Sequence, residues 1–137
     1  MTRSEIVPTL RYDDAPKMID WLCNAFGFAR HLVVEDGAGG IAHAQLTRGN
    51  AMIMFGSARN NEFDAIQSTA RALGGVSQSP YIIVDDVDSI CVKARATGAK
   101  IAIEPTDEDY GGRVFSCHDP EGQLWNFGTY DPWDAQK

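Results

Sequence analysis

The residue best suited to acid–base chemistry in this sequence is His43, which lies two positions before Gln45 in an alternating segment. An imidazole exchanges protons near neutral pH, so a histidine that faces a cavity can act as a general acid or base. The sequence places no carboxylate to orient His43, so a catalytic role competes with a simple binding role. The other histidines, His31 near a strand edge and His118 before a turn, are expected to be exposed.

Arg113 is the strongest candidate for a polar anchor, because alternation places it in the inward column of a strand. A guanidinium there needs an anionic or acceptor partner, since an unpaired buried charge is very costly. That partner is either a carboxylate or phosphate of a ligand, or an internal acid such as Glu104. Arg11 lies closer to a strand end and is expected to be solvated. Cys117 shares the inward column without an identifiable base and is expected to be a small apolar filler.

The composition indicates one globular domain of 137 residues, of which 44% are hydrophobic. A net charge of −7 argues against a nucleic-acid binder, which would need a basic face. The apolar runs are far shorter than the ~20 residues needed to cross a bilayer, and no secretory signal is visible. The three cysteines are odd in number and lack CxxC spacing, so we expect reduced thiols in a cytoplasmic protein without membrane partners.

An internal duplication reveals the elements that position these residues. At an offset of 72 residues, segment 10–14 lies on segment 82–86, and each ends in an aspartate suited to cap a helix. The offset continues into two helical stripes with i, i+3, i+4, i+7 spacing, which predict amphipathic helices. The stripes are Ala15, Met18, Ile19 and Leu22, and Val87, Ile90, Cys91 and Ala94.

Three extended segments follow each predicted helix, so each half is expected to be strand, helix and three strands. The predicted class is therefore α+β, with two tandem βαβββ modules that form curved, mostly antiparallel half-sheets with the helices outside. We expect a single domain over 1–137, with modules at 1–57 and 79–130, a connection at 58–78 and a tail at 131–137. The later strands are predicted near 29–35, 40–48, 50–56, 100–104, 112–118 and 123–129.

Alternation assigns a face to each strand. Leu10, Tyr12, Ile53 and Phe55, with their counterparts 72 residues later, are expected to be buried under the helices. The opposite face mixes apolar and polar groups, which is typical of a ligand cavity, although a solvated face or a dimer contact would have the same pattern. The residues expected on this face include Thr9, His43, Gln45, Met54, Tyr81, Arg113, Phe115 and Asn126.

Segment 110–127 contains Asp119-Pro120-Glu121-Gly122 and strongly resembles the last hairpin of the vicinal oxygen chelate superfamily. That superfamily includes glyoxalase I, extradiol dioxygenases, and fosfomycin- and bleomycin-resistance proteins. Segments 41–46 and 127–133 are most similar to the PhnB-like members. The resemblance implies a cup built from paired βαβββ modules over nearly the whole chain.

The resemblance also implies where a metal would bind, because metal-using members take His, Gln or Glu ligands from the first and last strand of each module. Those positions are Val7, Met54, Ser79 and Asn126 here. Valine has no donor atom, a methionine thioether is a soft ligand, and serine and asparagine are weak neutral ones. We therefore expect no metal and no cofactor.

We accordingly predict a metal-free small-molecule binding protein of the bleomycin-resistance kind, acting as a homodimer on a small organic ligand. The alternatives are a glyoxalase-like lyase, isomerase or dioxygenase with an atypical metal site or His43 acid–base chemistry, and a dimeric scaffold with a vestigial cavity. The expected ligand-binding residues are Thr9, His43, Gln45, Met54, Tyr81, Tyr110, Arg113, Phe115 and Asn126.

Overall fold

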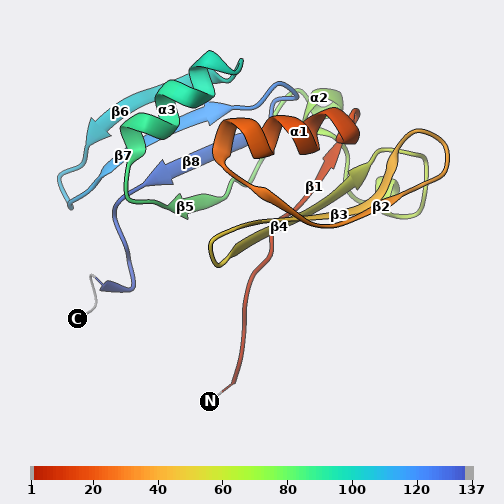
Figure 1. Ribbon diagram of the computed structural model, residues 1–137, viewed down its shortest axis with the longest axis horizontal. Coiled ribbons are helices and arrows are strands. Elements are labelled where there is room, and N and C mark those ends of the chain that lie inside the picture. The colour runs from red at the N-terminus through yellow and green to blue at the C-terminus, as the bar shows by residue number, and fades with distance from the viewer. Residues whose placement is uncertain (1, 135–137) are drawn as a thin grey trace. The chain divides into compact units, whose positions relative to one another are not determined.

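The computed structural model describes residues 2–134, which form two similar halves that each begin with a strand, a helix and three strands (Figure 1). The chain divides into two compact units, Met1–Leu73 and Gly74–Lys137, named unit 1 and unit 2 below. Unit 1 contains β1 (Thr9–Tyr12), α1 (Ala15–Phe26), β2 (Ala29–Glu35), β3 (Ile41–Arg48), β4 (Ala51–Ser57), the 3-10 helix η1 (Phe63–Ala65) and α2 (Ala70–Leu73). Unit 2 contains β5 (Tyr81–Ile83), α3 (Val87–Ala96), β6 (Lys100–Asp107), β7 (Arg113–His118) and β8 (Leu124–Gly128).

Unit 1 is a four-stranded sheet in the order β1-β4-β3-β2, with α1 packed on one face (Figure 1). β1 runs parallel to β4, and the other neighbouring strands are antiparallel. The residues of β3 and β4 that face α1 form the core, because period-two alternation places them all on one side. They are Ala44, Leu46, Ile53 and Phe55, each at most 3% exposed. The face opposite α1 is named the open face of unit 1.

Helix α1 begins at the predicted cap and ends at a glycine. The Asp14 carboxylate accepts a hydrogen bond from the N–H of Lys17, and Pro16 occupies the first turn, where its missing N–H leaves no bond unmade. Gly27 ends the helix with a φ of 79°, a left-handed conformation that favours glycine. The predicted apolar stripe is buried, which confirms the periodicity argument: Ala15, Met18, Ile19 and Leu22 are at most 1% exposed.

The segment after β4 packs back onto unit 1 through polar contacts. The Gln67 side chain donates to the carbonyl oxygen of Thr9 at 2.9 Å, and Arg71 forms an ion pair with Asp13 at 3.3 Å. β1 is the outer strand of its sheet, and a side chain bound to its carbonyl covers part of that edge. The connection predicted at 58–78 contains η1 and α2.

Unit 2 repeats the arrangement of unit 1, with the strand order β5-β8-β7-β6 and α3 packed against β6 and β7. Asp86 caps α3 by accepting the N–H of Ser89 at 3.0 Å, as predicted. The predicted α+β class with two βαβββ modules is confirmed. In the part of the chain that is described, no helix is both long and apolar enough to span a bilayer.

The two hairpins differ by one residue, and this difference corrects the predicted face of β7. In unit 1, Thr47 pairs with Met52 across residues 48–51. In unit 2, His118 pairs with Leu124 across residues 119–123, which is one residue more. The 72-residue offset therefore holds for β4 and β8 but becomes 71 for β3 and β7. A shift of one residue moves every side chain of a strand to the other face.

Phe115, Arg113 and Cys117 consequently lie on the helix side of unit 2, and their predicted place on the cavity face is wrong. Phe115 stacks on Phe127 with ring centroids 5.3 Å apart, and both rings are fully buried. Cys117 is fully buried beside Trp125, its partner in register. The face opposite α3, named the open face of unit 2, instead carries Val114, Ser116 and His118 from β7.

Candidate functional site

The open face of unit 1 carries a row of side chains that crosses all four strands. Leu32 pairs with Gln45, Gln45 with Met54, and Met54 with Thr9, so the row runs from β2 to β1. Three of the four expected binding residues of this unit therefore lie side by side, and His43 lies two positions along β3. Leu32 is 45% exposed, and the neighbouring Val34, which pairs with His43, is 44% exposed. The row thus combines apolar walls with an amide and an imidazole.

His43 contacts Gln45 and no acid. The amide nitrogen of Gln45 lies 3.0 Å from the Nε2 atom of the imidazole. Within residues 2–134, this amide is the only hydrogen-bonding partner found for the His43 side chain. A histidine that acts as a base is usually oriented by a carboxylate or carbonyl acceptor. The contact therefore favours a binding role for His43 over catalysis.

Arg11 lies on the same open face, and its predicted solvation is wrong. Its side chain is 7% exposed, pairs with Asp64, and lies over the Phe63 ring with its guanidinium carbon 5.2 Å from the centroid. Burial raises the pKa of Asp64, but hydrogen bonds from the Arg59 N–H, from Arg11 and from the Asn61 N–H outweigh this and lower it to about 2. The pair is therefore charged but internally neutralised.

In unit 2 the equivalent row consists of Ile103, Ser116, Asn126 and Tyr81, each paired in register with the next. The Ser116 hydroxyl donates to the Asn126 Oδ1 atom at 2.6 Å. The Asn126 Nδ2 atom donates to the Ser79 hydroxyl at 2.8 Å and to the Pro80 carbonyl at 3.0 Å. Ser116 was missed by the sequence analysis, although the longer Asp119–Gln123 turn was the signal that would have revealed it.

Tyr81 lies across the backbone of Gly128 on this open face. A Cβ atom at residue 128 would come within 2.3 Å of the Tyr81 hydroxyl, so glycine leaves room for the ring in this position. The hydroxyl donates to the Tyr130 carbonyl at 2.7 Å. Burial, together with nearby Tyr110, Tyr130 and Asp131, raises the pKa of Tyr81. The phenol is therefore neutral and forms part of the wall of the face.

The two remaining predicted residues have other surroundings. Arg113 bonds both Asp88, at 3.1 Å, and Asp107, at 3.1 Å, so its anionic partners are internal. Glu104, the acid suggested by the sequence, instead pairs with Arg95. Tyr110 is 63% exposed and packs edge-on against Tyr130 with centroids 4.9 Å apart. Arg113 therefore links α3 to β6 through ion pairs at the surface. Because its charge is already paired, the main argument for an anionic ligand is removed.

The cysteine thiols have no chemical role in these faces. Burial raises the pKa of Cys117 to about 12, and burial also raises the pKa of Cys91 and of Cys23. A thiol reacts as its thiolate, so a raised pKa makes each of them inert near neutral pH. The expectation that Cys117 fills space agrees with its complete burial.

The residues at the positions where the resemblance implies a metal do not fit a divalent cation. In unit 1 the two positions are Val7 and Met54. The valine side chain has no metal-donor atom, and the methionine offers only a soft thioether sulfur. In unit 2 the polar atoms of Asn126 are bonded to Ser116, Ser79 and Pro80. Across residues 2–134, no cluster of three or more His, Cys, Asp or Glu side chains has the arrangement of a metal site. We therefore assign no reaction step to a metal.

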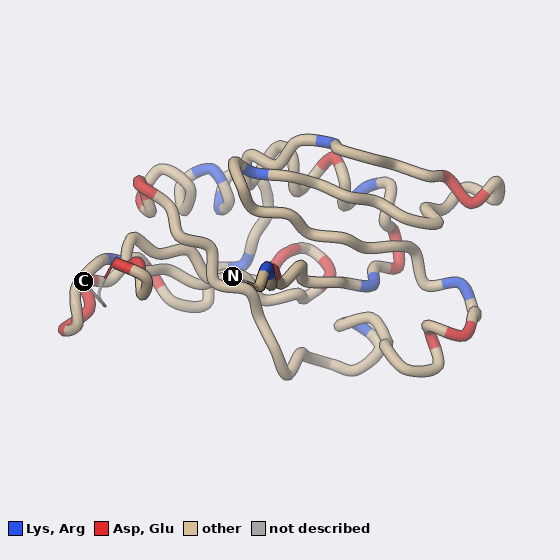
Figure 2. Tube along the Cα trace, turned by 90° about the horizontal axis from the view of Figure 1, so that it is seen from below, with Lys and Arg blue, Asp and Glu red and all other residues tan. Residues whose placement is uncertain are grey.

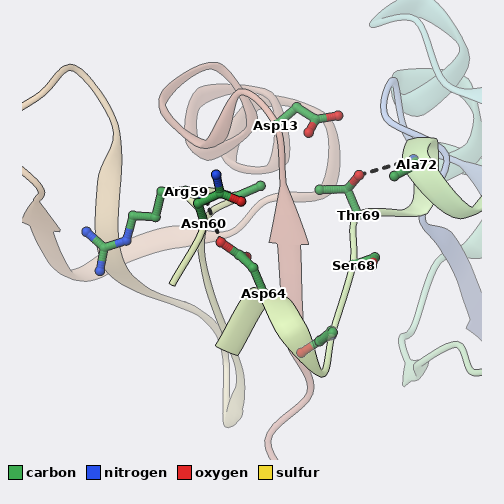
Figure 3. Close-up of a pocket in the computed structure, with 9 residues that line it drawn as sticks. Asp13, Arg59, Asn60, Asp64, Ser68, Thr69 and Ala72 are labelled. Atoms are coloured by element: carbon green, nitrogen blue, oxygen red, sulfur yellow. Dashed lines mark hydrogen bonds between the residues drawn. The ribbon is translucent and has the colours of Figure 1, made fainter. Parts of the chain in front are cut away.

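Unit 1 also contains a surface depression of about 520 Å³ beside the segment that follows β4 (Figure 3). Its two carboxylates are already engaged, since Asp13 pairs with Arg71 and Asp64 binds Arg11. A charged ligand would have to compete with these pairs. The sequence analysis did not find this depression, and the length of the segment, unusual for a simple loop, was the available signal.

The fold and residue pattern place the chain in a known family. Residues 6–127 match the Glyoxalase/Bleomycin resistance protein/Dioxygenase superfamily, and the chain belongs to this superfamily. The solved structure of TioX from Micromonospora sp. ML1 is 30% identical, with a TM-score of 0.71, and the match covers 91% of this chain and 94% of TioX.

More distant relatives share the fold or the sequence pattern. The fosfomycin resistance protein FosX from Listeria monocytogenes, solved with Mn(II) and a sulfate ion, has a TM-score of 0.70. It is 13% identical, covering 96% of this chain and 94% of FosX, so the likeness shows the fold alone. An uncharacterized protein of Mycobacterium tuberculosis strain H37Rv is 28% identical over 88% of this chain and 71% of its own.

Proposed function

We propose that this protein is a metal-free small-molecule binding protein of the bleomycin-resistance-like branch, which holds an organic ligand on an open face of one of its units. The observation that carries the proposal is the Asn126 amide. Its Oδ1 atom accepts a bond from Ser116, while its Nδ2 atom donates to Ser79 and Pro80. To ligate a cation, the amide would have to exchange the Ser116 bond for a weak neutral interaction. The residue that occupies a metal position in relatives here stabilises the sheet.

The apolar groups on both open faces support binding of an organic molecule. Leu32 and Val34 in unit 1, and Tyr81, Ile83 and Ile103 in unit 2, are between 40% and 55% exposed. Burying such groups releases about 25 cal/mol per Å² of apolar surface, and nearby amides and hydroxyls can orient the ligand. This combination is suited to recognition and not to Lewis-acid chemistry.

Elemental analysis tests the metal-free part of the proposal. The protein is purified without chelator and without a metal-affinity tag, and its zinc, nickel, manganese and iron are counted after dialysis. We expect well under one equivalent of each, and no rise in melting temperature when each ion is added. One equivalent of metal per chain retained after dialysis would contradict the proposal and favour an enzyme with an atypical metal site.

Native mass spectrometry tests the binding part. We expect protein purified directly from its host extract to carry a small organic molecule that is lost on denaturation. The matched control is the double variant Met54→Lys and Tyr81→Lys, which places a charge on each open face without touching either core. A molecule retained equally by the double variant would show that binding occurs elsewhere.

We also propose that the protein acts as a homodimer. Within residues 2–134, the outer strands of each sheet, β1 and β2 in unit 1 and β5 and β6 in unit 2, pair with a strand on one side only, and exposed strand edges are usually covered in native proteins. The exposed apolar groups on the open faces add surface that a second copy could bury. Light scattering at tens of micromolar is expected to give twice the chain mass. A monomer at that concentration would contradict this part of the proposal.

A further inference from the structure

The contact between Gln45 and His43 bears on which ring nitrogen carries the proton. The amide nitrogen of Gln45 faces the Nε2 atom of His43 at 3.0 Å. An amide nitrogen can donate a hydrogen bond but cannot accept one, so the Nε2 atom must act as the acceptor. A neutral imidazole has one donor and one acceptor nitrogen, and its proton then lies on the Nδ1 atom.

The strand backbone keeps the two side chains in this relation. His43 and Gln45 are two residues apart on β3, so they project from the same face at a spacing fixed by the pleat. Both are half-buried, which leaves them accessible to a ligand while restricting their motion. Because Gln45 also pairs with Met54 in register, its side chain is bordered on the β4 side as well.

The side chains paired in register with His43 and Gln45 are apolar. Val34 pairs with His43 across the β2–β3 boundary, and Leu32 pairs with Gln45. The cation on this open face, Arg11, is neutralised by Asp64. A donor in such surroundings forms a stronger hydrogen bond than in water, but it offers no charge to attract an ion.

We propose that Gln45 is a positioning residue that holds the His43 proton on Nδ1, so that the open face of unit 1 recognises a neutral hydrogen-bond acceptor on an otherwise apolar ligand. The chemical class is an aryl ketone, amide or similar carbonyl compound, rather than a carboxylate or an ammonium ion. This inference rests on the proposed binding function and names its ligand class.

The tautomer is measured directly by long-range ¹H–¹⁵N correlation spectra of the ¹⁵N-labelled protein, without any ligand. At about pH 8.5 a free imidazole is neutral, and each ring nitrogen reports whether it carries the proton. The His43 signals are assigned from their absence in His43→Phe. We expect a protonated Nδ1 and an unprotonated Nε2 in the natural protein. A protonated Nε2 would overturn the role given to Gln45.

Three variants separate positioning from general structure. Gln45→Glu replaces the donor by an acceptor, so the proton is expected to move to Nε2. Gln45→Leu removes the bond, and His43 is expected to show a mixture of tautomers. Gln78→Leu, at an exposed glutamine outside the sheet, is the matched control and should leave the spectrum unchanged. The same tautomer in all four proteins would also overturn the proposal.

The ligand class is tested with three fragments of similar size at millimolar concentration: acetophenone, benzoate and benzylammonium. We expect acetophenone to shift the His43 ring signals with an affinity at least ten-fold higher than either ion. Gln45→Glu should reduce its affinity several-fold, while Gln78→Leu should not. Equal or tighter binding of benzoate or benzylammonium would overturn the neutral-acceptor assignment.

These two arms also separate this inference from the proposed function. A wrong tautomer, or preference for an ion, with a co-purified molecule still present overturns the inference and leaves the binding function standing. The expected tautomer with no response to acetophenone overturns the ligand class. If no organic molecule co-purifies either, the binding function fails with it.

Discussion

The two units build the same sheet but differ in whether the open face carries an arginine. Arg11 pairs in register with Gly56 on the open face of unit 1, where it is buried with Asp64. The corresponding residue of unit 2 is Ile83, which pairs with Gly128 and is 41% exposed. Unit 2 has its sheet arginine, Arg113, on the helix side in partly exposed ion pairs. The units therefore share their backbone pairing but differ in where their polar side chains lie and in the partners that these side chains bind.

Charge differs between the units as well (Figure 2). Residues 1–73 contain seven basic and eight acidic side chains, a formal charge of −1. Residues 74–137 contain five basic and eleven acidic side chains, a formal charge of −6. Nearly all of the net negative charge therefore belongs to unit 2. The near-neutral unit is the one whose open face contains a buried ion pair and the His43–Gln45 contact.

The largest expected effect comes from breaking the buried pair of unit 1. Arg11→Met leaves Asp64 without its cation in a site that is 17% exposed. Removing one partner of a buried pair costs roughly 3–5 kcal/mol, so we expect a loss of stability near the lower end of that range. Urea denaturation of the variant and the natural protein measures it.

Arg113→Met is the matched control in unit 2, because it removes the same side chain from ion pairs whose carboxylates are at least 60% exposed. Solvent screens these pairs, so only a small change in the urea midpoint is expected. Equal losses in the two variants would show that the arginines have the same structural role despite their different burial.

The pH dependence of stability tests the same difference through Asp64. Its folded pKa of about 2 lies below the ordinary value of 3.8. A lowered folded pKa contributes stability that is present above pH 3.8 and is lost as the pH falls toward 2. The lowered pKa contributes roughly 2 kcal/mol to the free energy of unfolding, at about 1.4 kcal/mol for each unit of pKa shift. Asp64→Asn should reduce the acid-induced loss between pH 4 and 2, as followed by urea unfolding at each pH. An unchanged pH profile would contradict the lowered pKa.

A smaller difference is expected at the two glycines that face Arg11 and Tyr81. In Gly56→Ala the new Cβ atom would lie 2.9 Å from the backbone carbonyl oxygen of Ala42, which cannot move away easily. We expect a loss of about 1–2 kcal/mol, within the range for overpacking. In Gly128→Ala the new atom meets the Tyr81 ring, which is 40% exposed and can swing aside. Thermal melts compare the two. A larger loss at residue 128 would mean that the Tyr81 ring is held more firmly than its exposure suggests.

Local patterns in the sequence predicted most of the fold. The extended segments located the strands, and β2 was predicted at its observed bounds, 29–35. Asp14 and Asp86 were predicted as caps because a carboxylate before an apolar stripe satisfies free N–H groups. The open-face positions of Thr9, Gln45 and Met54 followed from alternation within unit 1. These features depend on neighbours within a few residues, so the sequence contains them directly.

What only the tertiary structure decided depends on contacts between distant residues. The duplication suggested one constant offset, but the longer turn before β8 changed it by one residue and moved Phe115 and Arg113 to the helix side. Arg11 and Arg113 each needed a carboxylate, and the choice of Asp64 and Asp88 depended on how η1 and α3 pack. Strand parity is a property of the whole register, and ion-pair partners are a property of packing. A single turn residue can therefore move two predicted site residues to the other face while leaving every local pattern intact.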